Sequence, residues 1–131
     1  MTKNQPRAAA PSIVLVIDPL EETRQVLSTV FERRGVRIVT ARRADEGLRL
    51  VREHHPDVIV LDSDAPSAGV DATAAREAID HDAEAAQTPV VHLVNARRLR
   101  ADDAPLTIRK PYHYGPLVHT IEELLSRRKA G

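Results

Sequence analysis

The sequence predicts one α/β domain of three layers, in which helices cover both faces of a doubly wound parallel sheet. The first of three observations leads to this fold class, and the other two bound the size of the domain and the sources of its stability. Short apolar runs alternate with segments of helical periodicity, and this pattern repeats five times along the chain. The length of 131 residues suits one domain with a substantial core. The chain contains no cysteine, which excludes disulfide bonds and cysteine-ligated zinc as sources of stability.

The first part of the chain opens with an apolar, β-branched run at residues 12–17, which is typical of a strand buried on both faces. At residues 21–34 the apolar residues recur with a helical period, and Gly35 follows where a left-handed residue would end that helix. Residues 36–40 alternate between polar and apolar, which indicates an edge strand. Residues 44–53 predict a second helix.

The middle of the chain continues this alternation. Residues 57–61 form a second apolar run and predict a third strand that is buried on both faces. Residues 62–69 form a loop by composition, and the alanine-rich, weakly amphipathic segment 71–79 predicts a helix. Residues 89–94 predict the fourth strand.

In the last part of the chain, the segment between the two predicted strands is short. Residues 95–103 have room for about two helical turns at most, which predicts a shortened fourth helix region. Residues 105–108 predict a short fifth strand, and residues 116–128 a closing helix with proline in its first turn and basic residues at its end. Residues 1–11, rich in proline and alanine, predict a disordered lead-in, so that the domain spans residues 12–128.

Composition and charge exclude several classes of function. Lys and Arg together number 19, as do Asp and Glu, so the chain is neutral, whereas proteins that bind nucleic acid are normally basic. The longest apolar run, residues 13–17, is far shorter than the roughly 20 residues that span a membrane. No secretory signal is visible in the first residues, so we expect a cytoplasmic protein.

Charged residues stand at the ends of three predicted strands, where ligands bind in doubly wound domains. Asp18 follows the first strand, Asp62 the third and Lys110 the fifth. Two neighbouring carboxylates repel each other unless a cation lies near both, and Mg²⁺ and a lysine ammonium would each relieve that repulsion. A carboxylate beside these cations can attack a phosphoryl group and hold it as an acyl phosphate.

This arrangement resembles the receiver domain of bacterial two-component response regulators, the CheY-like family, over nearly the whole chain. Its most specific parts are residues 56–62 with Pro66 four residues later, and the pair Lys110 and Pro111 after the fifth strand. The resemblance implies a flavodoxin-like (βα)5 fold with the strand order 2-1-3-4-5.

The resemblance also implies roles for individual residues. Asp62 would be the phosphoacceptor and Lys110 would contact the phosphoryl group. Asp18, Asp62 and the backbone carbonyl of Asp64 would be ligands of Mg²⁺. The expected partners are a histidine kinase, a phosphotransfer protein or a downstream effector, and no enzyme activity is expected beyond phosphorylation and dephosphorylation of the domain itself.

Three positions depart from the pattern of that family. Pro19 stands where a second acid is expected to bind Mg²⁺, and proline has no side-chain oxygen. Val94 replaces a hydroxyl residue that would hold the phosphoryl group, and Thr107 replaces an aromatic residue that would change rotamer on activation. We therefore expect an atypical receiver, or pseudo-receiver, in which phosphorylation of Asp62 with Mg²⁺ is weak or absent and the output is contact with other proteins.

Two alternatives remain open from the sequence. In the first, the domain is a working receiver, and the carboxylate of Asp64, Glu21 or Glu22 replaces the missing ligand. In the second, the same fold is an enzyme or binds a nucleotide or a flavin, although the first loop is not rich in glycine. The shortened fourth helix region further predicts a monomer or a dimer of unusual geometry.

Overall fold

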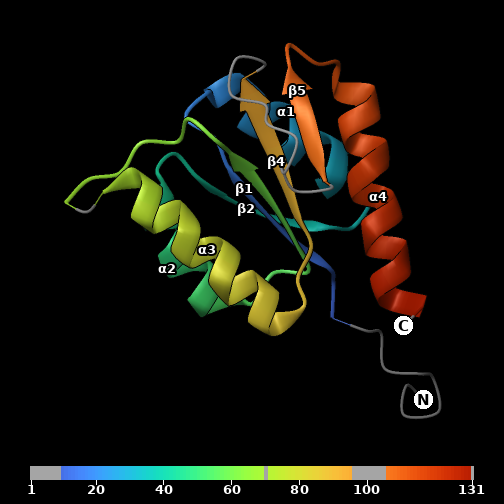
Figure 1. Ribbon diagram of the computed structural model, residues 1–131. Helices are drawn as coiled ribbons and strands as arrows, with labels where there is room; N and C mark the ends of the chain where they lie inside the picture. The colour runs from blue at the N-terminus through green and yellow to red at the C-terminus, as the bar shows by residue number, and fades with distance from the viewer. Residues whose placement is uncertain (1–9, 70, 96–105, 131) are drawn as a thin grey trace.

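Five parallel strands form one sheet in the computed structural model, which describes residues 10–69, 71–95 and 106–130. The strands are β1 (Ile13–Ile17), β2 (Arg37–Ala41), β3 (Val58–Asp62), β4 (Val90–Asn95) and β5 (Thr107–Lys110). They lie in the order β2-β1-β3-β4-β5 (Figure 1), so the predicted order and the edge position of the second strand are confirmed. Because the strands are parallel, their carboxyl ends all lie at one edge of the sheet.

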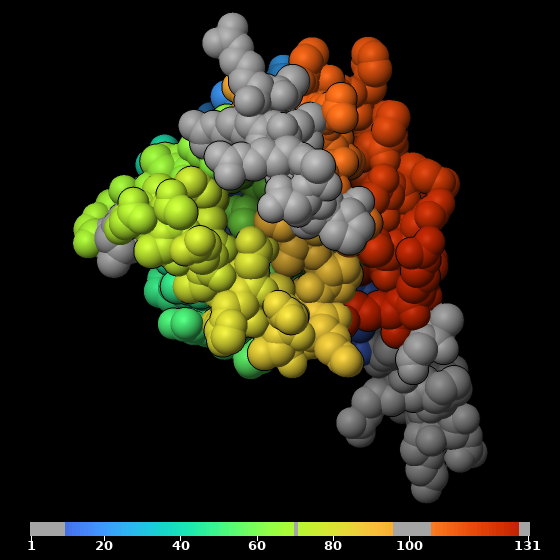
Figure 2. All heavy atoms as spheres, viewed as in Figure 1, coloured from blue at the N-terminus to red at the C-terminus, as the bar shows by residue number. Residues whose placement is uncertain are grey.

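Helices lie on both sides of this sheet, as expected of a doubly wound domain. They are α1 (Glu21–Glu32), α2 (Ala44–His54), α3 (Ala72–Ala86) and α4 (Tyr114–Ala130). The helices α1 and α4 cover one face, and α2 and α3 cover the other (Figure 1). The space-filling view in Figure 2 shows the outer surfaces of α3, in yellow, and α4, in red, on opposite sides of the molecule.

The central strands are apolar at successive positions because both of their faces are buried. Val14 and Val16 of β1 belong to the core beneath α1 and α4, whereas Leu15 and Ile17 belong to the core beneath α2 and α3. All four side chains are at most 1% exposed. Burial of each contributes about 1.5–3 kcal/mol relative to an exposed side chain, so the strand is held in place from both sides.

The third helix differs most from its predicted bounds of 71–79, since α3 continues to Ala86. Its start agrees with the sequence: Asp71 caps the helix, its side chain accepting a hydrogen bond of 3.2 Å from the Ala74 amide. The helix ends at Gln87, which adopts a left-handed conformation. Two of its three buried residues are alanines, so the apolar periodicity that would reveal its second half is weak.

Other differences from the predicted elements are small. The last strand is placed two residues later than predicted, at Thr107–Lys110, and the last helix begins at Tyr114. The predicted shortened fourth helix region, residues 95–103, falls on residues 96–105 except for Asn95, which ends β4, and most of the predicted lead-in falls on residues 1–9. Both lie outside the described residues. Within the part of the chain that the structure describes, no helix is long and apolar enough to cross a membrane.

Candidate functional site

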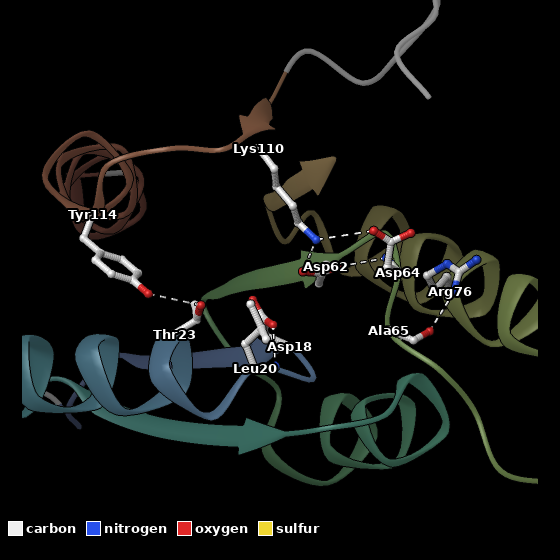
Figure 3. Close-up of polar contacts among 9 residues, drawn as sticks. All are labelled: Asp18, Leu20, Thr23, Asp62, Asp64, Ala65, Arg76, Lys110 and Tyr114. Atoms are coloured by element: carbon white, nitrogen blue, oxygen red, sulfur yellow. Dashed lines mark hydrogen bonds and ion pairs between the residues drawn. The ribbon is translucent and has the colours of Figure 1, made fainter. Parts of the chain in front are cut away.

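The carboxyl edge of the sheet brings together three charged residues from strands that are distant in sequence. Asp18 directly follows β1, Asp62 is the last residue of β3, and Lys110 is the last residue of β5. Figure 3 shows the Lys110 side chain reaching from its strand toward Asp62, with Asp18 beyond it at the end of β1. We call Asp18, Asp62 and Lys110 the acidic pocket.

The ion pair between Lys110 and Asp62 joins two of these strands. Lys110 Nζ lies 2.6 Å from Asp62 Oδ2 and 3.4 Å from Asp64 Oδ2. The Asp62 side chain is fully buried, whereas that of Lys110 is 26% exposed. Burial lowers the pKa of Lys110, but the hydrogen bond and the charge of Asp62, followed by those of Asp64, outweigh it and raise the pKa above its ordinary value. Lys110 therefore remains an ammonium ion beside Asp62.

The carboxyl group of Asp18 is in a less favourable environment. Its Oδ1 accepts a hydrogen bond of 2.8 Å from the Leu20 amide, and the residue is only 1% exposed. Burial raises its pKa from 3.8 to about 6; the Leu20 amide opposes this shift, and the charge of Asp62 adds to it. Ionised Asp18 is therefore costly to hold in the pocket without a further cation.

Two carboxylate oxygens of the pocket lack a hydrogen bond of normal geometry with any described residue, and they indicate which ligand the pocket could hold. Among the described residues, neither Asp18 Oδ2 nor Asp62 Oδ2 has a hydrogen bond of normal geometry, although both are buried, and Asp62 Oδ2 has only its ion pair with Lys110. Lys110 already supplies a cation to Asp62 Oδ2, whereas the buried Asp18 Oδ2 suits a hard cation such as Mg²⁺. The described residues contain no group of three or more acids, histidines or cysteines able to hold a metal, so these carboxylates fit the ion only in part.

The acids that could replace the missing ligand lie in different places. Glu22 accepts a hydrogen bond of 3.2 Å from the Tyr114 hydroxyl, and Glu21 accepts one of 3.4 Å from Gln25. These two carboxylates are therefore engaged outside the acidic pocket. The carboxylate of Asp64 alone of the three reaches Lys110, at 3.4 Å.

The loop after β3 is held in place by hydrogen bonds to its backbone. Asp62 Oδ1 accepts from the Asp64 amide at 2.7 Å, and Arg76 of α3 donates to the Ala65 carbonyl at 2.7 Å (Figure 3). The Ala44 amide at the start of α2 donates to the Pro66 carbonyl at 2.7 Å. These bonds fix the backbone beside Asp62 before any ligand binds.

Of the three positions that depart from the resemblance, Pro19 and Val94 have no side-chain oxygen, and Thr107 has no aromatic ring. Pro19 is exposed in the loop between β1 and α1. Val94, which is 8% exposed, lies one residue beyond Leu93, the register partner of Asp62. Thr107 is half-buried on β5, three residues before Lys110.

Sequence reasoning missed a polar cluster beside the pocket. Thr23 of α1 is buried, and its Oγ1 lies 3.4 Å from the Tyr114 hydroxyl. The rings of Tyr112 and Tyr114 pack edge to face, with centroids 5.8 Å apart. Burial raises the pKa of Tyr112 to about 12; a hydrogen bond with Thr23 opposes this shift, and the charge of Asp18 adds to it. The only available signal was that both tyrosines of the chain closely follow Lys110.

Comparison with known proteins shows which family the fold belongs to. A family model described as the response regulator receiver domain matches residues 14–122. The polar-differentiation response regulator DivK of Brucella ovis is 26% identical over 119 residues, which cover 86% of this chain and 94% of DivK. A protein-glutamate methylesterase/protein-glutamine glutaminase of Nitratidesulfovibrio vulgaris is 44% identical over 55 residues, which are 40% of this chain but only 15% of that enzyme.

The fold is also similar to solved structures. The receiver domain of a Francisella response regulator superposes with a TM-score of 0.72 at 24% identity, over 89% of this chain and 98% of that domain. At this identity the likeness concerns the fold, which agrees in full with the architecture described above.

Proposed function

The chain belongs to the response regulator receiver domain family, and from this premise we propose that it is an atypical receiver. It is a receiver domain of two-component signalling, a class whose members interact with histidine kinases and effectors. In the proposed function, Mg²⁺-dependent phosphorylation of Asp62 is weak or absent, and the domain acts through contact with another protein. A phosphotransfer protein is a further candidate partner.

The observation that carries this proposal is the shortage of oxygen ligands beside two buried carboxylates. Mg²⁺ demands a near-octahedral shell of oxygens at short distance. Pro19 has no side-chain oxygen to contribute, and Glu21 and Glu22 hydrogen-bond to residues outside the acidic pocket. An ion held there would keep more water ligands and less negative charge around it, which weakens its binding.

The chemistry of phosphorylation explains why this shortage matters. An oxygen of Asp62 would bond to phosphorus while the bond from phosphorus to the donor's leaving group breaks. Lys110 Nζ, which already contacts Asp62 at 2.6 Å, would offset charge on the transferred oxygens. Mg²⁺, held by Asp18, Asp62 and the Asp64 carbonyl, would supply further positive charge. Val94 offers no hydroxyl to the transferred group, so much of its stabilisation would depend on Lys110.

One observation favours a second candidate, a working receiver in which the carboxylate of Asp64 replaces the missing ligand. Asp64 Oδ2 lies 3.4 Å from Lys110 Nζ, and so reaches the group that contacts Asp62. To bind Mg²⁺ through Oδ2, the Asp64 carboxylate would have to exchange this ammonium contact for the metal.

The test is a titration with Mg²⁺ and beryllofluoride, which forms a stable analogue of an acyl phosphate, followed by calorimetry. The unsubstituted protein is compared with Asp62→Asn and with Asp64→Ala, and a receiver of established phosphorylation is the positive control. The proposal predicts that the unsubstituted protein binds the analogue weakly or not at all.

Tight binding that Asp62→Asn abolishes would contradict the atypical function. If Asp64→Ala also abolished that binding, the second candidate would be supported. Labelling with acetyl phosphate, with Asp62→Asn as the blank, gives an independent measurement of the same difference.

A further inference from the structure

The outer edge of β2 has no neighbouring strand among the described residues, because β2 is the first strand of the sheet and pairs only with β1. In a parallel pair, alternate residues direct both of their backbone groups toward the neighbouring strand. The Arg37 amide donates to the Ser12 carbonyl at 2.8 Å, so Arg37 and every second residue after it face β1. The amides and carbonyls of Ile38 and Thr40 therefore face outward.

A polar hollow lies beside this free edge, between β2 and α1. Its volume is about 430 Å³, and it is lined by the exposed Thr40 and by five side chains of α1, which are Glu21, Arg24, Gln25, Ser28 and Thr29. A strand added to β2 would direct alternate side chains to this face of the sheet. The lining contains one acid and one base, so the hollow favours polar side chains without selecting their charge.

Two arginines at the ends of β2 provide that selection. Arg37 begins the strand and Arg42 directly follows it, and both are exposed. Neither forms an ion pair with another described residue, whereas the adjacent Arg43 is paired with Asp45 at 3.3 Å. Like charges on neighbouring strands are destabilising, so antiparallel pairing with the β2 edge of a second copy would bring these arginines together unfavourably. The edge instead suits a strand with acids at its ends.

We propose that the free edge of β2 binds an extended acidic segment of a partner protein. The outward amides and carbonyls of Ile38 and Thr40 would hydrogen-bond to the backbone of that segment, as in other cases of strand addition. Two acids five residues apart, which is roughly 16 Å in an extended chain, would meet Arg37 and Arg42. The inference deepens the proposed function by naming a surface and a partner chemistry for its protein contact, and it does not depend on phosphorylation of Asp62.

The test measures the binding of two synthetic peptides of six residues by fluorescence anisotropy. Both carry fluorescein and have alternating threonine and valine in the middle, but one has aspartate at each end and the other has lysine. We expect saturable binding of the acidic peptide and binding weaker by about tenfold or more for the basic peptide. The buffer contains EDTA and no phosphoryl donor, so failure of this inference is distinguishable from failure of the proposed function.

Variants of β2 test the two kinds of contact separately. Arg37→Gln and Arg42→Gln should each weaken binding of the acidic peptide about threefold. Thr40→Pro removes an outward amide without removing a bond to β1, and it should abolish binding, whereas Thr40→Val keeps the amide and should still bind. The matched control is Arg109→Gln, which removes the same charge from β5 at the opposite edge of the sheet and should leave binding unchanged.

Hydrogen exchange in the unsubstituted protein locates the peptide without any change to the fold. The acidic peptide should slow exchange of the Ile38 and Thr40 amides, whereas the Val39 amide, which faces β1, should be unaffected. The inference is overturned if the acidic peptide does not bind, if the basic peptide binds as tightly, or if Arg109→Gln weakens binding as much as Arg37→Gln. Protection of β5 in place of β2 would also overturn it. Urea unfolding verifies that each variant remains folded.

Discussion

Lys110 Nζ lies 2.6 Å from Asp62 Oδ2, and this ion pair joins the carboxyl ends of β5 and β3. Asp62 is fully buried, so solvent water cannot stabilise the charge of its carboxylate. The ammonium group is therefore the nearest cation for a site that otherwise contains two carboxylates. Its position makes Lys110 important for stability as well as for any phosphoryl chemistry.

We expect Lys110→Met to lower the free energy of unfolding by about 2 kcal/mol at neutral pH. The substitution leaves the Asp62 carboxylate buried without its cation, and breaking a buried pair from one side is strongly destabilising. The expected loss is below the full value for a buried pair because the Lys110 side chain is 26% exposed. Urea unfolding measures this difference.

The control for this change is Arg109→Met, the adjacent and exposed cation on β5. Its effect should be within about 0.5 kcal/mol of zero. Adding Asp62→Asn to Lys110→Met should recover most of the loss. Equal destabilisation by the two methionine variants would contradict a specific role for the ammonium contact.

A second prediction concerns pH, because burial raises the pKa of Asp18 from 3.8 to about 6. Between these values the folded state binds more protons than the unfolded state, so the free energy of unfolding decreases as the pH rises through this window. At pH values above this window, the raised pKa of Asp18 lowers the free energy of unfolding by about 3 kcal/mol. Asp18→Asn should therefore stabilise the metal-free protein by about 1–3 kcal/mol at neutral pH.

The same substitution should reduce the slope of stability against pH between about 4 and 6. The amide oxygen of asparagine can still accept from the Leu20 amide, so the hydrogen bond at 2.8 Å is kept. Urea midpoints measured across this range provide the comparison. An unchanged slope would show that Asp18 does not carry the raised pKa.

The sequence predicts most of this fold because the relevant signals are local. The run at residues 12–17 is apolar because two helical layers cover it, and Gly35 adopts the left-handed conformation expected near a helix end. The second half of α3 has no such signal, since alanines fill much of its buried face and only Gln87, left-handed without being glycine, marks its end.

The candidate site is predictable to the extent that it depends on topology. Asp18, Asp62 and Lys110 each stand at a strand end, and parallel pairing brings those ends to one edge. The contact between Thr23 and Tyr114 joins residues that are 91 positions apart. It depends on how α1 and α4 pack side by side, and no periodicity or motif in the sequence encodes that packing.

A third prediction compares two glycines. A Cβ atom on Gly47 of α2 would lie 2.4 Å from Ile17 Cδ1 and 2.7 Å from Cγ1, so Gly47→Ala forces the core beneath α2 to shift. We expect a loss of about 1–3 kcal/mol in the free energy of unfolding. Gly115 of α4 meets no atom within 4 Å, and Gly115→Ala should be neutral or stabilise by up to about 1 kcal/mol. Equal effects in thermal unfolding would contradict the close contact.

A fourth prediction is a gain of metal binding. Pro19 is exposed in the loop beside Asp18 and occupies the position where an acid is expected, so Pro19→Asp adds a carboxylate to a pocket that already has two. Mg²⁺ affinity increases with the number of charged oxygen ligands, and we expect an increase on the order of tenfold in calorimetric titration. Beryllofluoride binding in the presence of Mg²⁺ should increase with it.

The control for this gain is Pro19→Asn, which changes the backbone in the same way but adds no charge. Replacing proline lowers the free energy of unfolding by about 0.4–1 kcal/mol, because the unfolded chain gains conformational entropy. Both variants share this effect. Only the aspartate should improve Mg²⁺ binding, and Asp62→Asn should remove the improvement. If Pro19→Asn binds Mg²⁺ as tightly as Pro19→Asp, the gain comes from a more flexible loop, and a missing carboxylate is not what weakens the site.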